Sequence, residues 1–164
     1  MNIKDYNLTS FYNLTEDEKL MVLEWRNHKN IKKWMFNSNI INQNTHFNFI
    51  NNLKNDKINK YFLVSLQKQY LGVIYFNNID YNLNECYFGL YANPNQTIKN
   101  IGKILEQVAI NYSFNIMNLR KLKVELFSNN LLAYLLHDSF GFNKTHEKII
   151  DNKKIIYMEK IKEI

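Results

Sequence analysis

A polar loop at residues 93–102 lies between a strand-like segment and a long amphipathic helix, and its residue types suit it to binding a phosphate group. The first turn of a helix carries amide N–H groups without partners and the positive end of the helix dipole, so an anion there needs little other support. Lys99 and Lys103 add positive charge, and Gly102 permits close approach of the backbone. One glycine is a weak signature, so an ordinary capped loop is the alternative. The residues expected to contact phosphate are Lys99, Asn100, Ile101, Gly102, Lys103 and Ile104.

Two side chains in the first part of the chain offer hydrogen-bond donors to a second charged group. Arg26 presents a planar fork of donors that fits a diphosphate, and His46 can donate to a phosphate. His28 stands at the end of a predicted helix, where the helix dipole favours a histidine, and we interpret it as structural.

The elements that must position these residues follow from hydrophobic periodicity. Thr15 and Glu18 form a capping box before an amphipathic stretch, which predicts a helix. From residue 61 the period changes to that of strands, separated by polar turns at 67–69 and 80–84. The expected ranges are a first strand within 3–12, helices at 16–28, 44–55, 98–116 and 130–139, and strands at 61–66, 70–79, 85–91, 121–127, 142–149 and 155–158.

This order predicts a single α/β domain over residues 1–164, built on a mixed sheet. The helix at 98–116 connects the strand at 85–91 to the strand at 121–127, and such a crossover makes two neighbouring strands parallel. Hydrophobic residues make up 46% of the chain and aromatic residues 15%, which is enough for one sizeable core. No repeat, low-complexity linker or change of composition divides the sequence.

The charge balance and the single cysteine argue against several classes of protein and of site. The formal net charge of +6 favours an acidic partner, although genomic base bias toward lysine and asparagine explains the charge equally well. The lysines are scattered, so no nucleic-acid binding is expected. Cys86 alone cannot form an internal disulfide or a multi-cysteine zinc site, and no metal is expected. Without a signal-like or membrane-spanning stretch, we expect a cytoplasmic protein that does not bind membranes.

Two segments together resemble the GCN5-related N-acetyltransferase (GNAT) superfamily. Asn130, Ala133 and Leu136, followed by Gly-Phe at 141–142, match the family's spacing. The family's loop pattern of Gln or Arg, two residues, Gly, one residue, and Gly or Ala falls on 97–102, where only the last position matches. The resemblance implies an α/β fold with a mixed, mostly antiparallel sheet of about seven strands flanked by about four helices. It also implies that acetyl-CoA lies between two splayed strands, with further contacts from Gly89, Leu90, Tyr91 and Asn130.

The same resemblance assigns the proton transfers. Where the family commonly has a tyrosine that protonates the leaving thiolate, this chain has His137. An imidazole, with an unperturbed pKa of about 6.5, is a competent acid near neutrality. Tyr134, one turn away, is the alternative acid, and a histidine without a catalytic part is the third interpretation. Glu125 matches an acidic position of the sugar-acetylating branch and is expected to accept the amine proton through water, unless it is merely a solvent-facing strand residue.

Within the superfamily, the chain resembles the branch that N-acetylates a UDP-linked 4-amino sugar on the route to pseudaminic acid, for surface or flagellin glycosylation. The segments that carry this resemblance are Glu-Trp-Arg-Asn-His at 24–28, Trp-Met-Phe at 34–36 and Asn-Thr-His-Phe-Asn-Phe at 44–49. It implies an apolar wall for a deoxysugar and hydrogen bonds to diphosphate and uracil, although packing is the alternative for the aromatic residues. The expected substrate-binding residues are Arg26, Met35, Phe36, His46, Phe49, Tyr75, Asn77 and Tyr87.

The reaction implied is direct transfer, in which the sugar amine attacks the thioester carbonyl of acetyl-CoA while a backbone amide within 86–91 polarises that carbonyl. Cys86 lacks an identifiable base and is a poor candidate for a covalent intermediate. Two other functions remain open at this point: an acetyltransferase for protein amino termini of the ribosomal-protein type, and a noncatalytic acetyl-CoA-binding or nucleotide-binding module. A homodimer is a further expectation.

Overall fold

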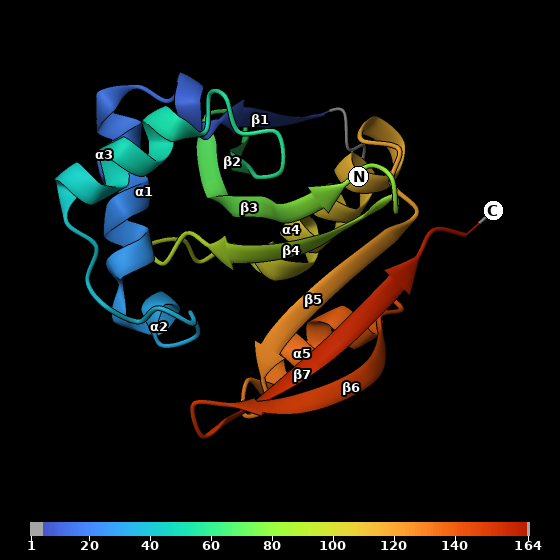
Figure 1. The fold of residues 1–164 in the computed structure, drawn as a ribbon. Helices are drawn as coiled ribbons and strands as arrows, with labels where there is room; N and C mark the ends of the chain where they lie inside the picture. The colour runs from blue at the N-terminus through green and yellow to red at the C-terminus, as the bar shows by residue number, and fades with distance from the viewer. Residues whose placement is uncertain (1–4, 164) are drawn as a thin grey trace.

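One seven-stranded mixed sheet organises residues 5–163, the part of the chain that this computed structural model describes (Figure 1). The strand order is β1-β2-β3-β4-β5-β7-β6, and every neighbouring pair is antiparallel except β4 with β5. That parallel pair results from the crossover through α4, as the order of elements predicted. The strands are β1 (Tyr6–Ser10), β2 (Lys60–Leu66), β3 (Gln69–Asp80), β4 (Glu85–Ala92), β5 (Lys121–Phe127), β6 (Asn143–Ile150) and β7 (Lys153–Ile161).

Helices cover both faces of this sheet, and each face has its own core. The helices are α1 (Glu16–Asn27), α2 (Lys29–Lys32), α3 (Gln43–Asn52), α4 (Ile101–Asn111) and α5 (Leu131–Ser139). One core joins α4 to the sheet through Leu105, Phe76 and Phe142, and the other joins α1 and α3 to it through Trp25 and Ile50. Among the described residues no helix is both long enough and apolar enough to cross a membrane.

Side chains alternate along β4, so this strand serves both cores. Cys86 and Phe88 are buried in the core on the α4 side, whereas Tyr91 is buried in the core on the α1 side. Alternate residues of β4 therefore point to opposite faces of the sheet, so each residue can contribute to only one of the two cores.

The predicted order of elements and the predicted sheet are confirmed, with differences at several element ends. The capping box at Thr15 is present, and the helix that it begins ends at Asn27. The long helix begins at Ile101 rather than 98, because Asn100 before it takes a left-handed conformation with φ 61°. It then continues into a π-helical turn, Tyr112–Ile116. A short helix that was not predicted, α2, follows α1, and the first part of the strand predicted within 3–12 lies outside the described residues.

Candidate active site

The gap between β4 and β5 is the centre of the candidate site. The two strands pair only at 85–87 with 121–123 and then diverge, as Figure 1 shows. A cavity of ≈ 500 Å³ opens where they part, and both strands, α5 and the segment around α2 line it. Its volume is in the range of sites that hold a small molecule or a cofactor.

The backbone of β4 directs hydrogen-bonding groups into this gap. The N–H of Asn93, just after β4, donates to the carbonyl of Leu71 at 2.8 Å, in register with β3. Since alternate residues of a strand direct their N–H and C=O groups to opposite edges, Tyr91 and Gly89 face β3 and Leu90 faces the gap. A backbone amide there can polarise a carbonyl held between the strands.

The loop after β4 leads from the cavity to the start of α4. Asn93 is buried and braces the loop, since its side chain donates to the Tyr70 carbonyl at 3.0 Å and accepts from the Asn95 N–H at 2.9 Å. From this loop Asn93, Pro94 and Gln96 line the cavity, and the predicted phosphate contacts from Lys99 onward lie beyond them at the helix start.

The predicted amide donors at that helix start are not all available. The N–H of Ile104 donates to the Asn100 carbonyl at 3.1 Å, as the helix requires, so Ile104 cannot offer its amide to a phosphate. The first-turn amides of Ile101, Gly102 and Lys103 precede that first helical bond. A Cβ added at Gly102 would find its nearest neighbour at 3.5 Å, on Leu136, so the protein itself leaves room beside this residue.

His137 lies in the last turn of α5 and lines the cavity, although it is only 7% exposed. Asn130 caps α5 by accepting a hydrogen bond from the Ala133 N–H at 3.3 Å. The His137 ring meets the ring of Phe88 edge-on, with centroids 5.7 Å apart, and its Nδ1 lies 2.9 Å from Oε1 of Glu106 on α4. His137 is therefore a buried, oriented imidazole and not a surface histidine.

Tyr134, the alternative acid, does not share this position. It is half-buried and packs against the core on the α4 side, and it is absent from the residues that line the cavity. Of the two predicted candidates, His137 is the one that the fold brings to the gap.

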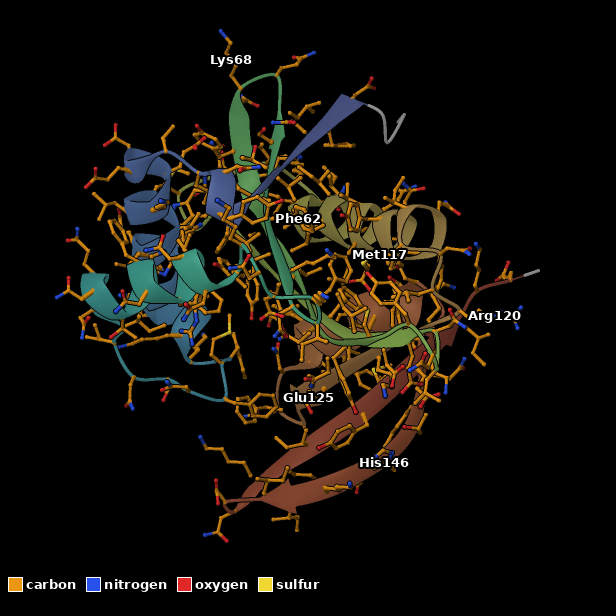
Figure 2. The ribbon with its side chains drawn as sticks, turned by 45° about the horizontal axis from the view of Figure 1, so that its top comes forward. Phe62, Lys68, Met117, Arg120, Glu125 and His146 are labelled. Atoms are coloured by element: carbon orange, nitrogen blue, oxygen red, sulfur yellow. The ribbon has the colours of Figure 1, made fainter. Side chains whose placement is uncertain are left out.

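Glu125 lies on β5, on the other face of the sheet from His137. Its neighbours Val124 and Leu126 belong to the core on the α4 side, so strand alternation turns Glu125 toward the opposite face (Figure 2). It is directly opposite Tyr157 of β7 in the sheet register. Although the side chain reaches solvent, partial burial in the cavity wall raises the pKa of its carboxyl. A carboxylate with a raised pKa is better suited to accept a proton.

A second cavity, of ≈ 360 Å³, adjoins the first on the α1 side of the sheet. Tyr75, Asn77 and Tyr91 line both cavities, together with Met35 and Phe36. The two cavities therefore lie next to each other, with these residues between them. The fold thus provides two adjoining places for ligands.

Arg26 lines the second cavity and has one nitrogen without a partner. Its Nη2 donates to the Asn37 carbonyl at 2.7 Å, whereas Nη1 is buried and has no hydrogen-bond partner within residues 5–163. Only half of the predicted donor fork is therefore free. The side-chain oxygen of Asn77 is also buried, and no described residue forms a hydrogen bond to it. Buried polar groups without partners are costly, so both atoms are suited to bind a ligand.

His46 reaches the same cavity but differs from its predicted role. It is 5% exposed, and its Nε2 lies 3.0 Å from the carbonyl of Lys19. Since a carbonyl can only accept, Nε2 carries the hydrogen, and burial lowers the pKa of the ring, which is therefore neutral near pH 7. The remaining nitrogen, Nδ1, is an acceptor, so in this state His46 cannot donate to a phosphate as predicted.

Aromatic side chains form the walls of the second cavity. Phe36 is 52% exposed and Phe49 38%, so neither is a core residue, and Phe49 packs edge-on against Tyr61 at 5.0 Å. Met35 packs against the core on the α1 side while also lining the cavity. The alternative of packing therefore holds in part for Met35 and also for Phe36, whose ring lies 5.1 Å from that of the buried Phe127. Tyr87, in the first cavity, lies under the ammonium group of Lys123, 4.5 Å from the ring centre.

Tyr75 stands between the two cavities because Gly89 makes room for it. The two residues are directly paired in the β3–β4 register, and a Cβ at position 89 would come within 2.3 Å of the Tyr75 ring. Tyr75 stacks on Tyr61 with centroids 5.1 Å apart. Burial strongly raises the pKa of the Tyr75 hydroxyl, which therefore stays protonated and can donate a hydrogen bond.

Cys86 is a core residue, as predicted. It is fully buried in β4, and burial raises the pKa of its thiol to about 12. A thiol held in this state does not supply a thiolate nucleophile near neutral pH.

Glu106 was not predicted as a site residue, although its position in the sequence carries a signal. It lies beside Leu105 and three residues before Ala109 on a helix whose inward face is otherwise apolar, and it is fully buried. An acidic residue on the core stripe of a helix indicates a buried ionic partner. Tyr61 and Tyr157, which stand beside Tyr75 and Glu125, were also missed, and no local pattern distinguished them from other strand aromatics.

Comparisons with known proteins bear on this geometry. No model of a protein family matches the chain. The acetyltransferase PseH of Campylobacter jejuni strain 81-176 is 35% identical over 150 residues, which cover 92% of this chain and 89% of that protein. The chain belongs to the PseH acetyltransferase family. PseH of C. jejuni strain NCTC 11168 has the same identity and coverage.

Solved structures of PseH have the same architecture. The crystal structure of C. jejuni PseH superposes with a TM-score of 0.78 at 30% identity, covering 97% of this chain and 99% of that one. The complex of PseH with acetyl-coenzyme A gives 0.78 at 31% identity, with coverage of 96% and 99%. Spermidine N-acetyltransferase from Vibrio cholerae, with CoA and spermine, gives 0.86 at 20% identity over 96% of each chain and shares the fold alone. The predicted GNAT fold is confirmed.

Proposed function

We propose that this protein transfers the acetyl group of acetyl-CoA to the 4-amino group of a UDP-linked 4-amino-4,6-dideoxy-N-acetylhexosamine, in pseudaminic acid biosynthesis. Its family makes it an acetyl-CoA-dependent N-acetyltransferase. The observation that carries the acceptor class is the second cavity, which joins the gap between β4 and β5 and contains a buried, unpartnered Arg26 nitrogen. A guanidinium in such a place is suited to an anionic acceptor.

The residues of the first cavity fit acetyl-CoA. The Leu90 amide faces the gap, and the first-turn amides at Ile101, Gly102 and Lys103, with the charges of Lys99 and Lys103, fit a pyrophosphate at the start of α4. Acetyl-CoA supplies an activated thioester. The protein's part is to hold that group in the gap and to polarise its carbonyl with the Leu90 amide.

Two residues on opposite faces of the sheet are placed to handle the two protons of the reaction. Glu125 lies on the face of the second cavity, where the amine enters, and receives the amine proton through water. His137 lies on the α5 side of the gap, where it gives a proton to the leaving thiolate. A direct transfer needs no covalent enzyme intermediate, and the buried Cys86 thiol fits that conclusion.

The acceptor site combines polar and apolar contacts. Nη1 of Arg26 binds the diphosphate, and Nδ1 of His46 accepts a hydrogen bond, for example from the N–H of a uracil ring.

The apolar part of the acceptor site is formed by Met35, Phe36 and Phe49, which exclude water around the methyl group of the deoxysugar. Asn77, Tyr75 and Tyr87 stand where the sugar meets the gap.

An acetylation assay against several UDP-amino sugars, with detection of the product by mass, tests this proposal. We expect turnover with a UDP-4-amino sugar and none with a peptide carrying a ribosomal-type amino terminus. Turnover of the peptide alone contradicts the acceptor class, and tight acetyl-CoA binding without turnover of any amine indicates a noncatalytic module.

Arg26→Ala tests the acceptor site directly. We expect the KM for the sugar nucleotide to rise about 10- to 100-fold, because a hydrogen bond from a charged group to phosphate is lost, while the KM for acetyl-CoA stays the same. Arg26 also holds the loop at Asn37, so a control must loosen that loop alone. Asn27→Ala does so, because Asn27 pairs with both the N–H and the carbonyl of Ile41. Equal effects of the two variants contradict a role of Arg26 in binding the nucleotide.

We further propose that the protein acts in the cytoplasm as a homodimer that pairs through β6. This strand is one edge of the sheet and is exposed along its whole length, with Ile149 75% exposed and Ile150 45%. An exposed strand edge with apolar residues is a template for pairing with a second strand. Light scattering is expected to give twice the monomer mass for the unchanged protein. For the Ile149→Lys variant it is expected to give a smaller mass, because the added charge weakens the contact between the two strands. A monomeric mass for the unchanged protein contradicts the proposal.

A further inference from the structure

We propose that Glu106 is the positioning residue for His137, and that the pair acts as one proton-donating unit in the acetyl transfer. This inference rests on the proposed function in that it takes His137 as the acid for the leaving thiolate. Glu106 itself lies behind the imidazole, on α4, and is not among the residues that line the cavity.

The contact between the two side chains fixes the imidazole. Oε1 of Glu106 lies 2.9 Å from Nδ1 of His137, and the Glu106 side chain is fully buried. A carboxylate accepts, so Nδ1 carries a hydrogen and donates it to Glu106. Nε2 is then the ring nitrogen that remains for the cavity that His137 lines. The pair thereby sets both the tautomer and the direction of the working nitrogen.

The burial of Glu106 supports a charged partnership. A fully buried carboxylate is costly unless it is paired, and His137 is its one hydrogen-bond partner within residues 5–163, since Oε2 of Glu106 has none. Two further neighbours of the ring carry no charge: Phe88 of β4 and Phe142, which leads into β6, both pack against it. On α5 itself Asp138 is exposed, and Tyr134 is half-buried one turn earlier.

The chemistry that follows is a balanced proton transfer. When His137 is protonated, Glu106 stabilises the imidazolium through Nδ1–H. As the thioester C–S bond breaks, the Nε2–H bond breaks and an S–H bond forms, so the thiol leaves neutral. His137 returns to the neutral ring with its Nδ1–H still donated to Glu106, and solvent in the cavity restores the proton on Nε2.

A double-mutant cycle tests the coupling. Glu106→Gln is expected to lower kcat about 10- to 100-fold, with little change in the KM for acetyl-CoA, because a neutral amide orients and stabilises the imidazolium less. His137→Tyr removes the imidazole that contacts Glu106 and introduces the tyrosine that the family commonly has at this position. In that background Glu106→Gln is expected to change kcat less than about threefold.

A control variant and a spectroscopic measurement separate a positioning role of Glu106 from a purely structural one. Ser113→Ala removes another fully buried polar group just beyond α4 and reports what such a loss costs without His137. Nitrogen chemical shifts of the four histidine rings, assigned with His137→Tyr, are expected to show hydrogen on Nδ1 of His137 in the unchanged protein and a loss of that preference in Glu106→Gln.

Some outcomes overturn the proposal. An equal drop of kcat in both backgrounds, or hydrogen on Nε2 alone in neutral His137, contradicts it. Should Glu106→Gln fail to fold, the ring shifts of the unchanged protein still decide. Those shifts need no acceptor substrate, so failure of the proposed sugar acetylation is distinguished from failure of this pair.

Discussion

At the scale of single residues, the two candidate proton-handling groups are separated by the sheet itself. Glu125 points to the face that α1 and α3 cover, and His137 comes from α5 on the other face, so the gap between β4 and β5 lies between them. This arrangement suits a reaction in which one molecule loses a proton as another gains one. Neither group has to change its role during one turnover.

Replacing Glu125 by Gln is expected to lower kcat about 10- to 100-fold, because the amine proton loses its acceptor. Burial raises the pKa of the Glu125 carboxyl, so it becomes protonated, and inactive as a base, at a higher pH than an ordinary glutamate. On acidification, kcat of the unchanged enzyme is therefore expected to decline at a higher pH than it would with an ordinary glutamate. The variant should lack this acidic decline in kcat. Measurement of kcat from pH 5 to 8 checks it. The substrate amine ionises in both enzymes alike, and the exposed Glu16→Gln is the control.

At the scale of elements, the pairing of β3 with β4 shapes the boundary between the two cavities. Gly89 has no side chain, so the ring of Tyr75 lies across β4 and forms a wall shared by the two cavities. The early divergence of β5 from β4 then leaves the Leu90 backbone facing open space. Two local features, one missing side chain and one interrupted strand pair, therefore create the site.

Gly89→Ala is expected to destabilise the protein by about 1–3 kcal/mol, because the added Cβ overlaps the Tyr75 ring and forces it out of its stack on Tyr61. Thermal unfolding checks the loss, and acceptor turnover should fall with it. In a Tyr75→Ala background the ring is gone, so the added methyl should cost little. An equal loss in both backgrounds shows that strain in the β4 backbone, and not the ring, is responsible.

At the scale of the whole molecule, the net positive charge suits the binding of anionic ligands. The formal net charge is +6, and two lysines flank the start of α4. A field of this sign increases the encounter rate with negatively charged ligands and is screened by salt.

Lys99→Ala combined with Lys103→Ala is expected to raise the KM for acetyl-CoA several-fold and to flatten its dependence on NaCl concentration, because two charges near the pyrophosphate are lost. Initial rates between 20 and 500 mM salt measure both effects. Lys68→Ala is the matched control, since Lys68 lies at the tip of the β2–β3 hairpin, away from the gap (Figure 2). A similar change in the control variant indicates general screening and contradicts a local phosphate site.

Much of the fold could be predicted because periodicity is local. The capping box at Thr15 and the apolar stripe of α4 both depend on residues that are close together in the sequence, and both helices are present. The ends of α4 were harder to predict, since the left-handed Asn100 and the π-helical turn at Tyr112–Ile116 depend on packing. The site residues on α5 could be predicted from the spacing of a family motif. The role of Glu106 was not predicted, because it depends on a contact with His137, which lies 31 residues away in the chain.

The sequence by itself determined the elements, their order, the crossover that makes β4 and β5 parallel, and the residue types available for acid, base and anion binding. The tertiary structure alone decided which of them meet. It selected His137 over Tyr134 at the gap, turned His46 into an acceptor by bonding it to Lys19, and occupied half of the Arg26 fork with Asn37. The physical reason is that contacts between residues far apart in the chain determine the protonation state of each side chain. They also determine which donors and acceptors remain free for a ligand, and no local sequence pattern encodes such contacts.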